Sequence, residues 1–140
     1  FNVFGPRQDP RSAYAAAVPI FIAKALRDET ISIHGDGGQT RDFIHVTDII
    51  GALAYTGESK DMSGTYNVGY GQSQSILALA QEIIRLTGSK SVIEHLPLRA
   101  GDVRHSVAST ERLLSAGWKP QSSVSAGLAE TVEYFRRLKA

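Results

Sequence analysis

The sequence contains no cysteine among its 140 residues. Disulfide bonds, thiolate zinc sites and cysteine nucleophiles are therefore excluded, and a chain without cysteine favours a cytoplasmic setting. Long apolar runs are absent too, since none approaches the roughly 20 residues that a membrane-spanning helix needs. We therefore expect neither a disulfide framework nor a transmembrane helix.

Neither sign of charge is in excess, because 15 Lys and Arg side chains stand against 14 Asp and Glu side chains. The net charge of +1 gives no electrostatic reason to expect nucleic acid or a membrane surface as a partner. Hydrophobic residues nevertheless make up 42% of the chain, which is enough to bury a core and argues against disorder. Length and composition thus indicate one small globular domain or a part of a larger one.

Strand-like and helix-like segments alternate along the chain, and this alternation predicts an α/β protein. Strands are predicted at residues 1–4, 31–33, 43–46, 65–69 and 91–96. Helices are predicted from Val18 or Pro19 to about Asp28, after a cap at Thr47 and Asp48, over 75–87 and 110–116, and from Ser123 or Ser125 onward. The strands are short and isolated, so they would form a poor sheet alone, because a parallel sheet needs both faces covered.

The first residues, Phe1 to Phe4, have the pattern of a strand that enters a turn at Gly5 and Pro6. Asn2 is the polar exception in this strand. Taken alone, it is best interpreted as an amide that satisfies a local turn. The alternative is an amide at the carboxyl end of a strand, which is where open α/β sheets bind their ligands.

A glycine-rich stretch, Gly35-Asp36-Gly37-Gly38, precedes Arg41 and Asp42. It does not lead from a strand into a helix, so we interpret it as a hairpin turn and not as a phosphate-binding loop. Arg41 has two interpretations. It could form a surface pair with Asp42, which would contribute little to stability, or its planar guanidinium could bind a phosphate.

A second cationic cluster lies at Arg99-Ala100-Gly101-Asp102-Val103-Arg104-His105. Composition alone leaves a solvated charged loop and a binding site equally open. As a binding site, Arg99 and Arg41 could hold a diphosphate while Asp102 accepts a hydrogen bond from a sugar hydroxyl. The four histidines lack the spacing of a metal site, so we expect no metal centre, and no Ser-His-Asp arrangement stands out.

Several of these segments, in this order, resemble the C-terminal part of the nucleotide-sugar epimerases. These enzymes belong to the extended short-chain dehydrogenase/reductase superfamily, and the chain is similar to its UDP-glucose and UDP-N-acetylglucosamine 4-epimerases. The resemblance covers essentially the whole chain. It rests on Phe-Asn-Val-Phe-Gly-Pro-Arg-Gln-Asp-Pro at 1–10, Ala-Val-Pro at 17–19, Gly-Asp-Gly-Gly-Gln-Thr-Arg-Asp-Phe-Ile-His-Val-Thr-Asp at 35–48, Tyr-Asn-Val-Gly at 66–69, Arg-Ala-Gly-Asp-Val-Arg-His-Ser at 99–106 and Gly-Trp-Lys-Pro at 117–120.

The resemblance implies an α/β fold in which this chain supplies the substrate-binding lobe and completes the nucleotide-binding sheet of an extended Rossmann-type dehydrogenase. It also implies roles for individual residues. Phe1 would approach the nicotinamide end of NAD, and Asn2 would contact the phosphates of the sugar nucleotide. Arg41 and Arg99 would bind the diphosphate, and Asp102 would bind the uridine ribose. The residues implied around the uracil and ribose are Ala16, Ala17, Val18, Ser32 and His34.

The catalytic motifs that the resemblance implies are missing from these residues. No Gly-x-x-Gly-x-x-Gly stretch for NAD occurs, and none of the five tyrosines is followed four residues later by the lysine of a Tyr-x-x-x-Lys pair. We therefore expect residues 1–140 to be the nucleotide-sugar-binding portion, without a catalytic residue, and the NAD-binding portion to lie upstream of Phe1. The chain alone is then predicted to be inactive.

For the intact enzyme, the resemblance implies an NAD-dependent 4-epimerase that inverts C4 of a UDP-hexose such as UDP-glucose or UDP-galactose, through a transient 4-keto sugar. It also implies a homodimer. Two alternatives stay open: a nucleotide-sugar 4,6-dehydratase, decarboxylase or reductase of the same superfamily, and a non-catalytic module that binds a nucleotide sugar. The expected partners are a UDP-sugar and the N-terminal portion, and neither nucleic acid nor a membrane.

Overall fold

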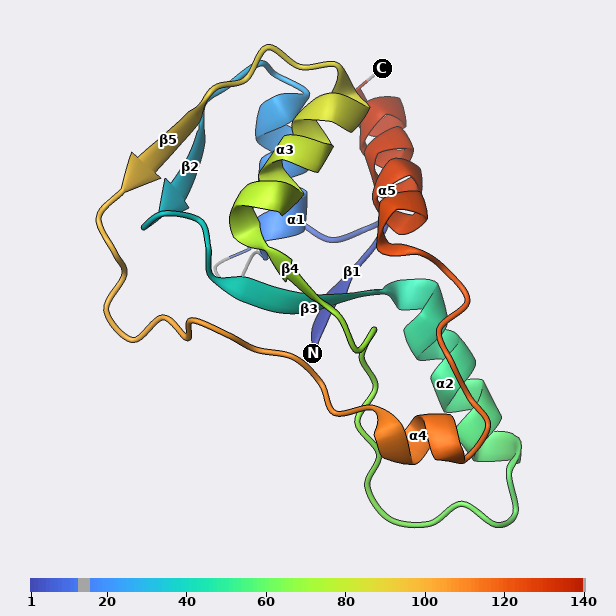
Figure 1. The fold of residues 1–140 in the computed structure, drawn as a ribbon. Helices are drawn as coiled ribbons and strands as arrows, with labels where there is room; N and C mark the ends of the chain where they lie inside the picture. The colour runs from blue at the N-terminus through green and yellow to red at the C-terminus, as the bar shows by residue number, and fades with distance from the viewer. Residues whose placement is uncertain (13–15, 140) are drawn as a thin grey trace.

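The computed structural model of the chain describes residues 1–12 and 16–139, and its strands form two small sheets (Figure 1). In the first sheet, β1 (Asn2–Phe4) and β4 (Ser73–Ser75) flank β3 (Thr40–His45), with β1 parallel and β4 antiparallel to it. In the second sheet, β2 (Ile31–His34) runs parallel to β5 (Ile93–Leu96). Helices and strands alternate along the chain, so the predicted α/β class is confirmed.

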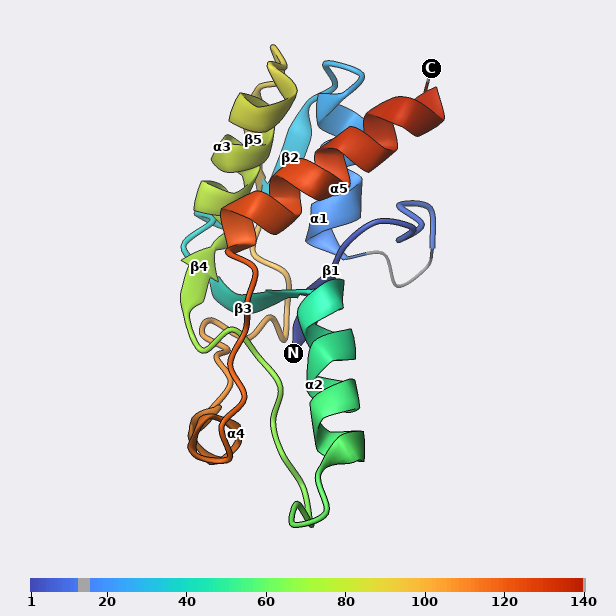
Figure 2. The same ribbon diagram turned by 90° about the vertical axis from the view of Figure 1, so that its right-hand side faces the viewer.

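Three helices enclose the main hydrophobic core together with these strands. Figures 1 and 2 show α1 (Ala17–Ala25), α3 (Ile76–Thr87) and α5 (Val124–Lys139) packed together beside β2. Apolar residues recur in each helix at the three- and four-residue spacing of one face, and this face is the one that is buried. Its members and their strand partners include Phe4, Val18, Ile22, Ile31, Ile33, Leu79, Ile83, Leu128 and Val132.

The bounds of α3 follow directly from local sequence. The Ser75 hydroxyl accepts a hydrogen bond from the Ala78 N–H at 3.1 Å, which satisfies one of the free donors at the start of the helix. At the other end, Gly88 adopts a left-handed φ of 67°, a conformation that glycine reaches without a steric penalty. The helix predicted over 75–87 is thereby confirmed, with Ser75 as its N-terminal cap.

A second, smaller core lies between α2 (Val46–Glu58) and α4 (Glu111–Ser115), at the end of the molecule away from α1 and α3 (Figure 2). The buried side chains of this core are Ile44, Ala52, Leu113 and Trp118.

Within the described ranges, no helix has both the length and the apolar character needed to cross a membrane.

The predicted cap of α2 is wrong. The helix begins at Val46, directly after His45, so Thr47 and Asp48 already lie in its first turn. The Thr47 hydroxyl contacts His45 Nδ1 at 2.7 Å, while the buried Asp48 carboxylate accepts hydrogen bonds from backbone N–H groups just before α5. Both side chains thus serve contacts other than the orphan donors of their own helix.

The strand predicted at 65–69 is also wrong, and β4 forms a few residues later instead. In this region the N–H groups of Tyr70 and Gly71 donate to the carboxylate of Asp42, and Gly71 has a left-handed φ of 77°. Directly after residues 65–69 the chain therefore turns, and Tyr70 donates its N–H to a buried side chain 28 residues earlier in the sequence.

Candidate functional site

The structure brings Arg41 of β3 into contact with Asp102, although 61 residues separate them. The Arg41 Nη2 atom donates to the Asp102 carboxylate, and Nη1 donates to the carbonyl oxygens of Val103 at 2.6 Å and Thr40 at 2.8 Å. The Arg41 side chain is only 18% exposed. The guanidinium is therefore held at a fixed point at the start of β3, and it pairs with Asp102 rather than with its neighbour Asp42.

Arg99 and Asp102 belong to one tight turn. The Asp102 N–H donates to the Arg99 carbonyl oxygen at 3.2 Å, and Gly101 between them has a left-handed φ of 79°, which explains why glycine stands there. Arg99 itself is exposed. Because Asp102 of the same turn pairs with Arg41, the turn brings the exposed Arg99 into the neighbourhood of Arg41.

Asn2 lies on the strand next to Arg41. It stands opposite Phe43 in the parallel register of β1 and β3, and its Nδ2 atom donates to the Asp42 carbonyl oxygen at 3.1 Å. The amide therefore joins two strands, and the local turn that we favoured for Asn2 from sequence is not what it satisfies.

Ser32 and His34 lie on β2, which leads to the same region through its pairing with β5. The Ser32 hydroxyl is 3.5 Å from the Glu94 carboxylate, and His34 Nδ1 is 3.0 Å from the Pro97 carbonyl oxygen. Because Pro97 directly precedes the segment with Arg99, the chain continues from the carboxyl end of β5 into the cationic turn, which is the turn of Arg99 to Asp102.

Ala16, Ala17 and Val18 form the start of α1, next to residues that lie outside the described ranges. The Val18 side chain has no exposed surface and points into the main core. The whole of Val18, backbone included, is 0% exposed, whereas Ala16 and Ala17 are partly exposed and could contact a ligand at this place. Phe1, by contrast, is 51% exposed at the start of β1.

The glycine-rich turn makes an ion pair that the sequence did not suggest. Asp36 binds both terminal nitrogens of Arg104, at 2.6 and 2.9 Å, and also accepts the Gly38 N–H at 2.9 Å. The Arg104 guanidinium, helped by the Gly38 N–H, holds the pKa of the Asp36 carboxyl well below its usual range. The turn leads into strand β3 and not into a helix, but the predicted hairpin is wrong, because β2 before the turn and β3 after it belong to different sheets.

Asp42 is the residue of this region that sequence reasoning missed. Its carboxylate has no exposed surface and accepts three backbone N–H groups, from Tyr70 at 2.8 Å, Gly71 at 3.0 Å and Ala108 at 3.1 Å. The one sequence feature that could have indicated this role is a carboxylate at the start of an apolar strand run, Phe43 to Val46. Its donors lie too far along the chain to be named from a pattern.

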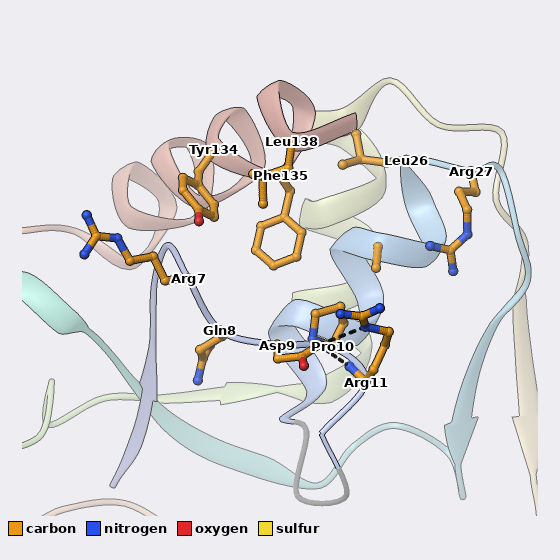
Figure 3. Close-up of a pocket in the computed structure, with 11 residues that line it drawn as sticks. Arg7, Gln8, Asp9, Pro10, Arg11, Leu26, Arg27, Tyr134, Phe135 and Leu138 are labelled. Carbon is orange, nitrogen blue, oxygen red and sulfur yellow. Dashed lines mark hydrogen bonds and ion pairs between the residues drawn. The ribbon is translucent and has the colours of Figure 1, made fainter. Parts of the chain in front are cut away.

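A cavity of about 480 Å³ lies elsewhere, between residues 7–11, α1 and α5 (Figure 3). Aromatic and aliphatic side chains of α5 face it, and two of the arginines around it are engaged, Arg11 with Asp9 at 3.3 Å and Arg27 with Glu29 at 2.6 Å. The sequence-predicted site residues are not among its described lining. In the described part of the chain, no group of three His, Asp or Glu side chains could hold a metal ion.

Comparison with known proteins gives this geometry a family context. Residues 1–69 match the model of the NAD dependent epimerase/dehydratase family. A UDP-glucose 4-epimerase of Mycolicibacterium smegmatis is 38% identical over 136 residues, which are 96% of this chain and 43% of that protein.

Solved structures show the same relationship. The chain superposes with a TM-score of 0.92 and 36% identity on a UDP-glucose 4-epimerase with UDP-glucose from Thermotoga maritima, over 99% of this chain and 45% of that one. For a UDP-N-acetylglucosamine 4-epimerase from Methanobrevibacter ruminantium in complex with UDP-N-acetylmuramic acid, the TM-score is 0.91 and the identity 41%, over 99% and 44%. The chain thus spans less than half the length of the relatives it matches, and it corresponds to their C-terminal part. Residues 1–69 thus match the NAD dependent epimerase/dehydratase family, and nearly the whole chain is similar to the C-terminal part of UDP-sugar 4-epimerases.

Proposed function

We propose that this chain holds the UDP part of a nucleotide sugar within an NAD-dependent 4-epimerase. The observation that carries the proposal is the contact of Arg41 with Asp102 beside the turn of Arg99, three charged residues that chemistry had already suggested for a nucleotide sugar. Support also comes from the relatives described above, of which one contains UDP-glucose and another a UDP-sugar derivative.

The two charged partners suit an exchange of contacts on binding. Without ligand, the Arg41 guanidinium and the Asp102 carboxylate neutralise each other in a half-buried place. A diphosphate would replace Asp102 as the partner of Arg41, and the freed carboxylate would accept hydrogen bonds from the ribose hydroxyls. Both side chains keep hydrogen-bond partners in both states, which avoids the penalty of leaving one of them buried and unsatisfied. Arg99 adds a second cation for the diphosphate.

The remaining assignments place the nucleotide between the two sheets. Asn2 would contact a phosphate from β1, although its amide must then share its contact with the Asp42 carbonyl oxygen. Ser32 and His34 would lie beside the base at the end of β2. The partly exposed Ala16 and Ala17 would line the uracil and ribose, while Val18, which has no exposed surface, would support them from the core.

NAD fits this chain at one point. Phe1 is 51% exposed, and an exposed aromatic ring can lie against a planar ring, so it would contact the nicotinamide end. The glycine-rich turn at 35–38 does not fit the cofactor diphosphate, because a strand follows it and the first N–H groups of α3, from Ile76 and Leu77, already donate to the carbonyl oxygens of Gln39 and Gly37. When bound, NAD takes up a hydride from the sugar and gives it back. The rest of its site is assigned to the N-terminal portion of the enzyme.

The chain would contribute binding energy remote from the reacting carbon. By fixing the UDP group it orients the sugar at the catalytic groups, which come from the N-terminal portion, and so converts binding into catalysis. Residues 1–140 alone are then inactive, and the complete enzyme, a homodimer by analogy with its family, inverts C4 of a UDP-hexose.

The reaction is tested by product analysis with the full-length protein, NAD and either UDP-glucose or UDP-N-acetylglucosamine. We expect the C4 epimer to accumulate to an equilibrium mixture, as followed by proton NMR, and no conversion by residues 1–140 alone. A 4-keto-6-deoxy sugar as product, or release of CO2 when a UDP-uronic acid is supplied instead, would overturn the epimerase proposal in favour of a sister reaction. UDP binding without any turnover would favour the non-catalytic module.

A further inference from the structure

Asp42 joins three separate segments of the chain at one buried point. Its carboxylate binds Tyr70 and Gly71, which precede β4, and Ala108, which follows the cationic turn. Its carbonyl oxygen accepts the Asn2 amide from β1. Four hydrogen bonds from three segments thus meet at the residue directly after Arg41.

The segment with Arg99 and Asp102 is anchored at both ends. At its start the Gly35 N–H donates to the Leu96 carbonyl oxygen at 2.8 Å, which ties the end of β5 to the end of β2. At its far end a parallel bridge joins His105 to Thr40, with backbone hydrogen bonds of 2.9 and 3.2 Å. The Asp42–Ala108 bond then closes this second anchor with a charged, fully buried acceptor.

The side chains and backbone around this anchor are closely packed. A Cβ atom on Gly69 would lie 2.4 Å from Ala108 Cβ and 2.7 Å from Asp42 Oδ2. Three backbone donors surround a carboxylate that has no exposed surface, so any loss of its charge or shape would leave buried N–H groups without an acceptor. The position of residue 108 relative to β3 is therefore tightly determined.

We propose that Asp42 is a positioning residue for the nucleotide-sugar site: it sets where the Arg99–Asp102 turn stands relative to Arg41 and Asn2, without contacting the ligand. This inference rests on the proposed function. It assigns Asp42 a task that its neighbour Arg41 cannot perform, because Arg41 reaches the turn through contacts that ligand binding would exchange, while the Asp42 contacts would persist.

The chain offers a matched control in Asp48. It too is buried and accepts backbone N–H groups, from Gln121 at 2.8 Å and from Ser122 at 3.3 Å, but it ties α2 to the segment before α5 and touches none of the proposed site residues. Asp42→Asn and Asp48→Asn therefore remove the same kind of interaction at two places, of which only one is proposed to position the site.

The experiment measures UDP affinity by calorimetry for the full-length protein and these two variants, at a temperature where thermal melting shows all three folded. Asp42→Asn is expected to weaken UDP binding about tenfold, in the range of couplings within one hydrogen-bond network, while Asp48→Asn stays within about twofold of wild type. In an Arg99→Ala/Asp102→Ala background the effect of Asp42→Asn should vanish, because the groups it positions are gone. A general loss of stability would not produce this dependence on the background.

A second measurement needs no variant and covers the case in which Asp42→Asn does not fold. Saturating UDP should slow hydrogen exchange at Tyr70, Gly71 and Ala108 of the wild-type protein and leave Gln121 and Ser122 unchanged. Suppose that the wild-type protein binds UDP. If UDP then gives no such protection, or if the two variants bind UDP equally well, this inference alone is overturned. Wild-type protein that does not bind UDP overturns the proposed function and the inference with it.

Discussion

At the scale of single residues, the close packing beside the Asp42 carboxylate limits which substitutions the chain tolerates. Gly69→Ala would force its new methyl group against Ala108 and Asp42, at 2.4 and 2.7 Å. We expect this substitution to lower the free energy of unfolding by about 1–3 kcal/mol, the usual effect of overpacking. Urea unfolding followed by circular dichroism measures it.

Gly57→Ala is the matched control for this substitution. Gly57 lies inside α2 and a Cβ atom there would meet nothing within 4 Å. Alanine has the higher helix propensity, so this variant should be more stable than wild type by up to about 1 kcal/mol. Equal stabilities of the two variants would contradict the account of the Gly69 packing.

The Asp36–Arg104 pair predicts a dependence of stability on pH. Since Arg104 lowers the pKa of Asp36 in the folded state, the unfolded state binds the proton more readily, and the pair stabilises the fold above the ordinary Asp pKa near 3.8. Asp36→Asn should therefore be less stable than wild type at pH 7, and the difference should shrink as the pH falls below about 4. The effect is small because both side chains are half exposed or more.

Denaturant unfolding at pH 7 and pH 3 measures this difference. Asp61→Asn serves as control, because Asp61 is an exposed carboxylate that forms no ion pair within the described residues. A stability difference between wild type and Asp36→Asn that is as large at pH 3 as at pH 7 would contradict the role of the pair.

The chemistry of single residues was open to prediction, while their pairing was not. Residue type alone suggested that Arg41, Arg99 and Asp102 could serve a diphosphate and a sugar hydroxyl. The sequence offered Asp42 as the partner of Arg41 because the two are adjacent, but on a strand adjacent side chains point to opposite faces. Asp42 therefore turns inward, and Arg41 meets a carboxylate 61 residues away.

At the scale of elements, the cap of α3 provides a direct test of local structure. Ser75→Ala removes the hydroxyl that accepts the Ala78 N–H at 3.1 Å. We expect a loss of about 1 kcal/mol in unfolding free energy, which is typical for an N-terminal cap. Ser73→Ala, at an exposed position of β4 next to it, should change stability by less than about 0.5 kcal/mol. Equal effects of the two substitutions in thermal or urea unfolding would exclude the capping role.

The elements that could be predicted from sequence are those whose determinants are local. Helix α3 could be predicted because its cap, its apolar face and the terminal Gly88 all lie within the element or directly beside it. In the first turn of α2 and in the turn that follows residues 65–69, the side chains of Asp48 and Asp42 accept hydrogen bonds from partners 73 and 28 residues away. Long-range side-chain bonds to backbone leave no periodic pattern, and these are the places where sequence reasoning went wrong.

At the scale of the whole molecule, the described residues form two hydrophobic cores. Strands β1 and β3, which carry Asn2 and Arg41 of the proposed site, contribute side chains to both cores. The outer face of α2 remains open, with Ile50 and Leu53 60% and 65% exposed. The chain spans less than half the length of the relatives that it matches, and the task that we propose for this part is to bind UDP. The central claim is therefore about binding and can be tested without turnover.

The most direct test is the affinity of the full-length protein for UDP, measured by calorimetry for wild type, Arg41→Ala and Arg99→Ala. Arg85→Ala is the control, because it removes an equal charge from an exposed pair with Glu82 on α3. The account predicts that each site variant binds UDP about 1.5–3 kcal/mol more weakly, roughly 10- to 150-fold, as expected for a charge-assisted hydrogen bond, and that the control binds like wild type. Unchanged UDP affinity in both Arg41→Ala and Arg99→Ala would contradict it.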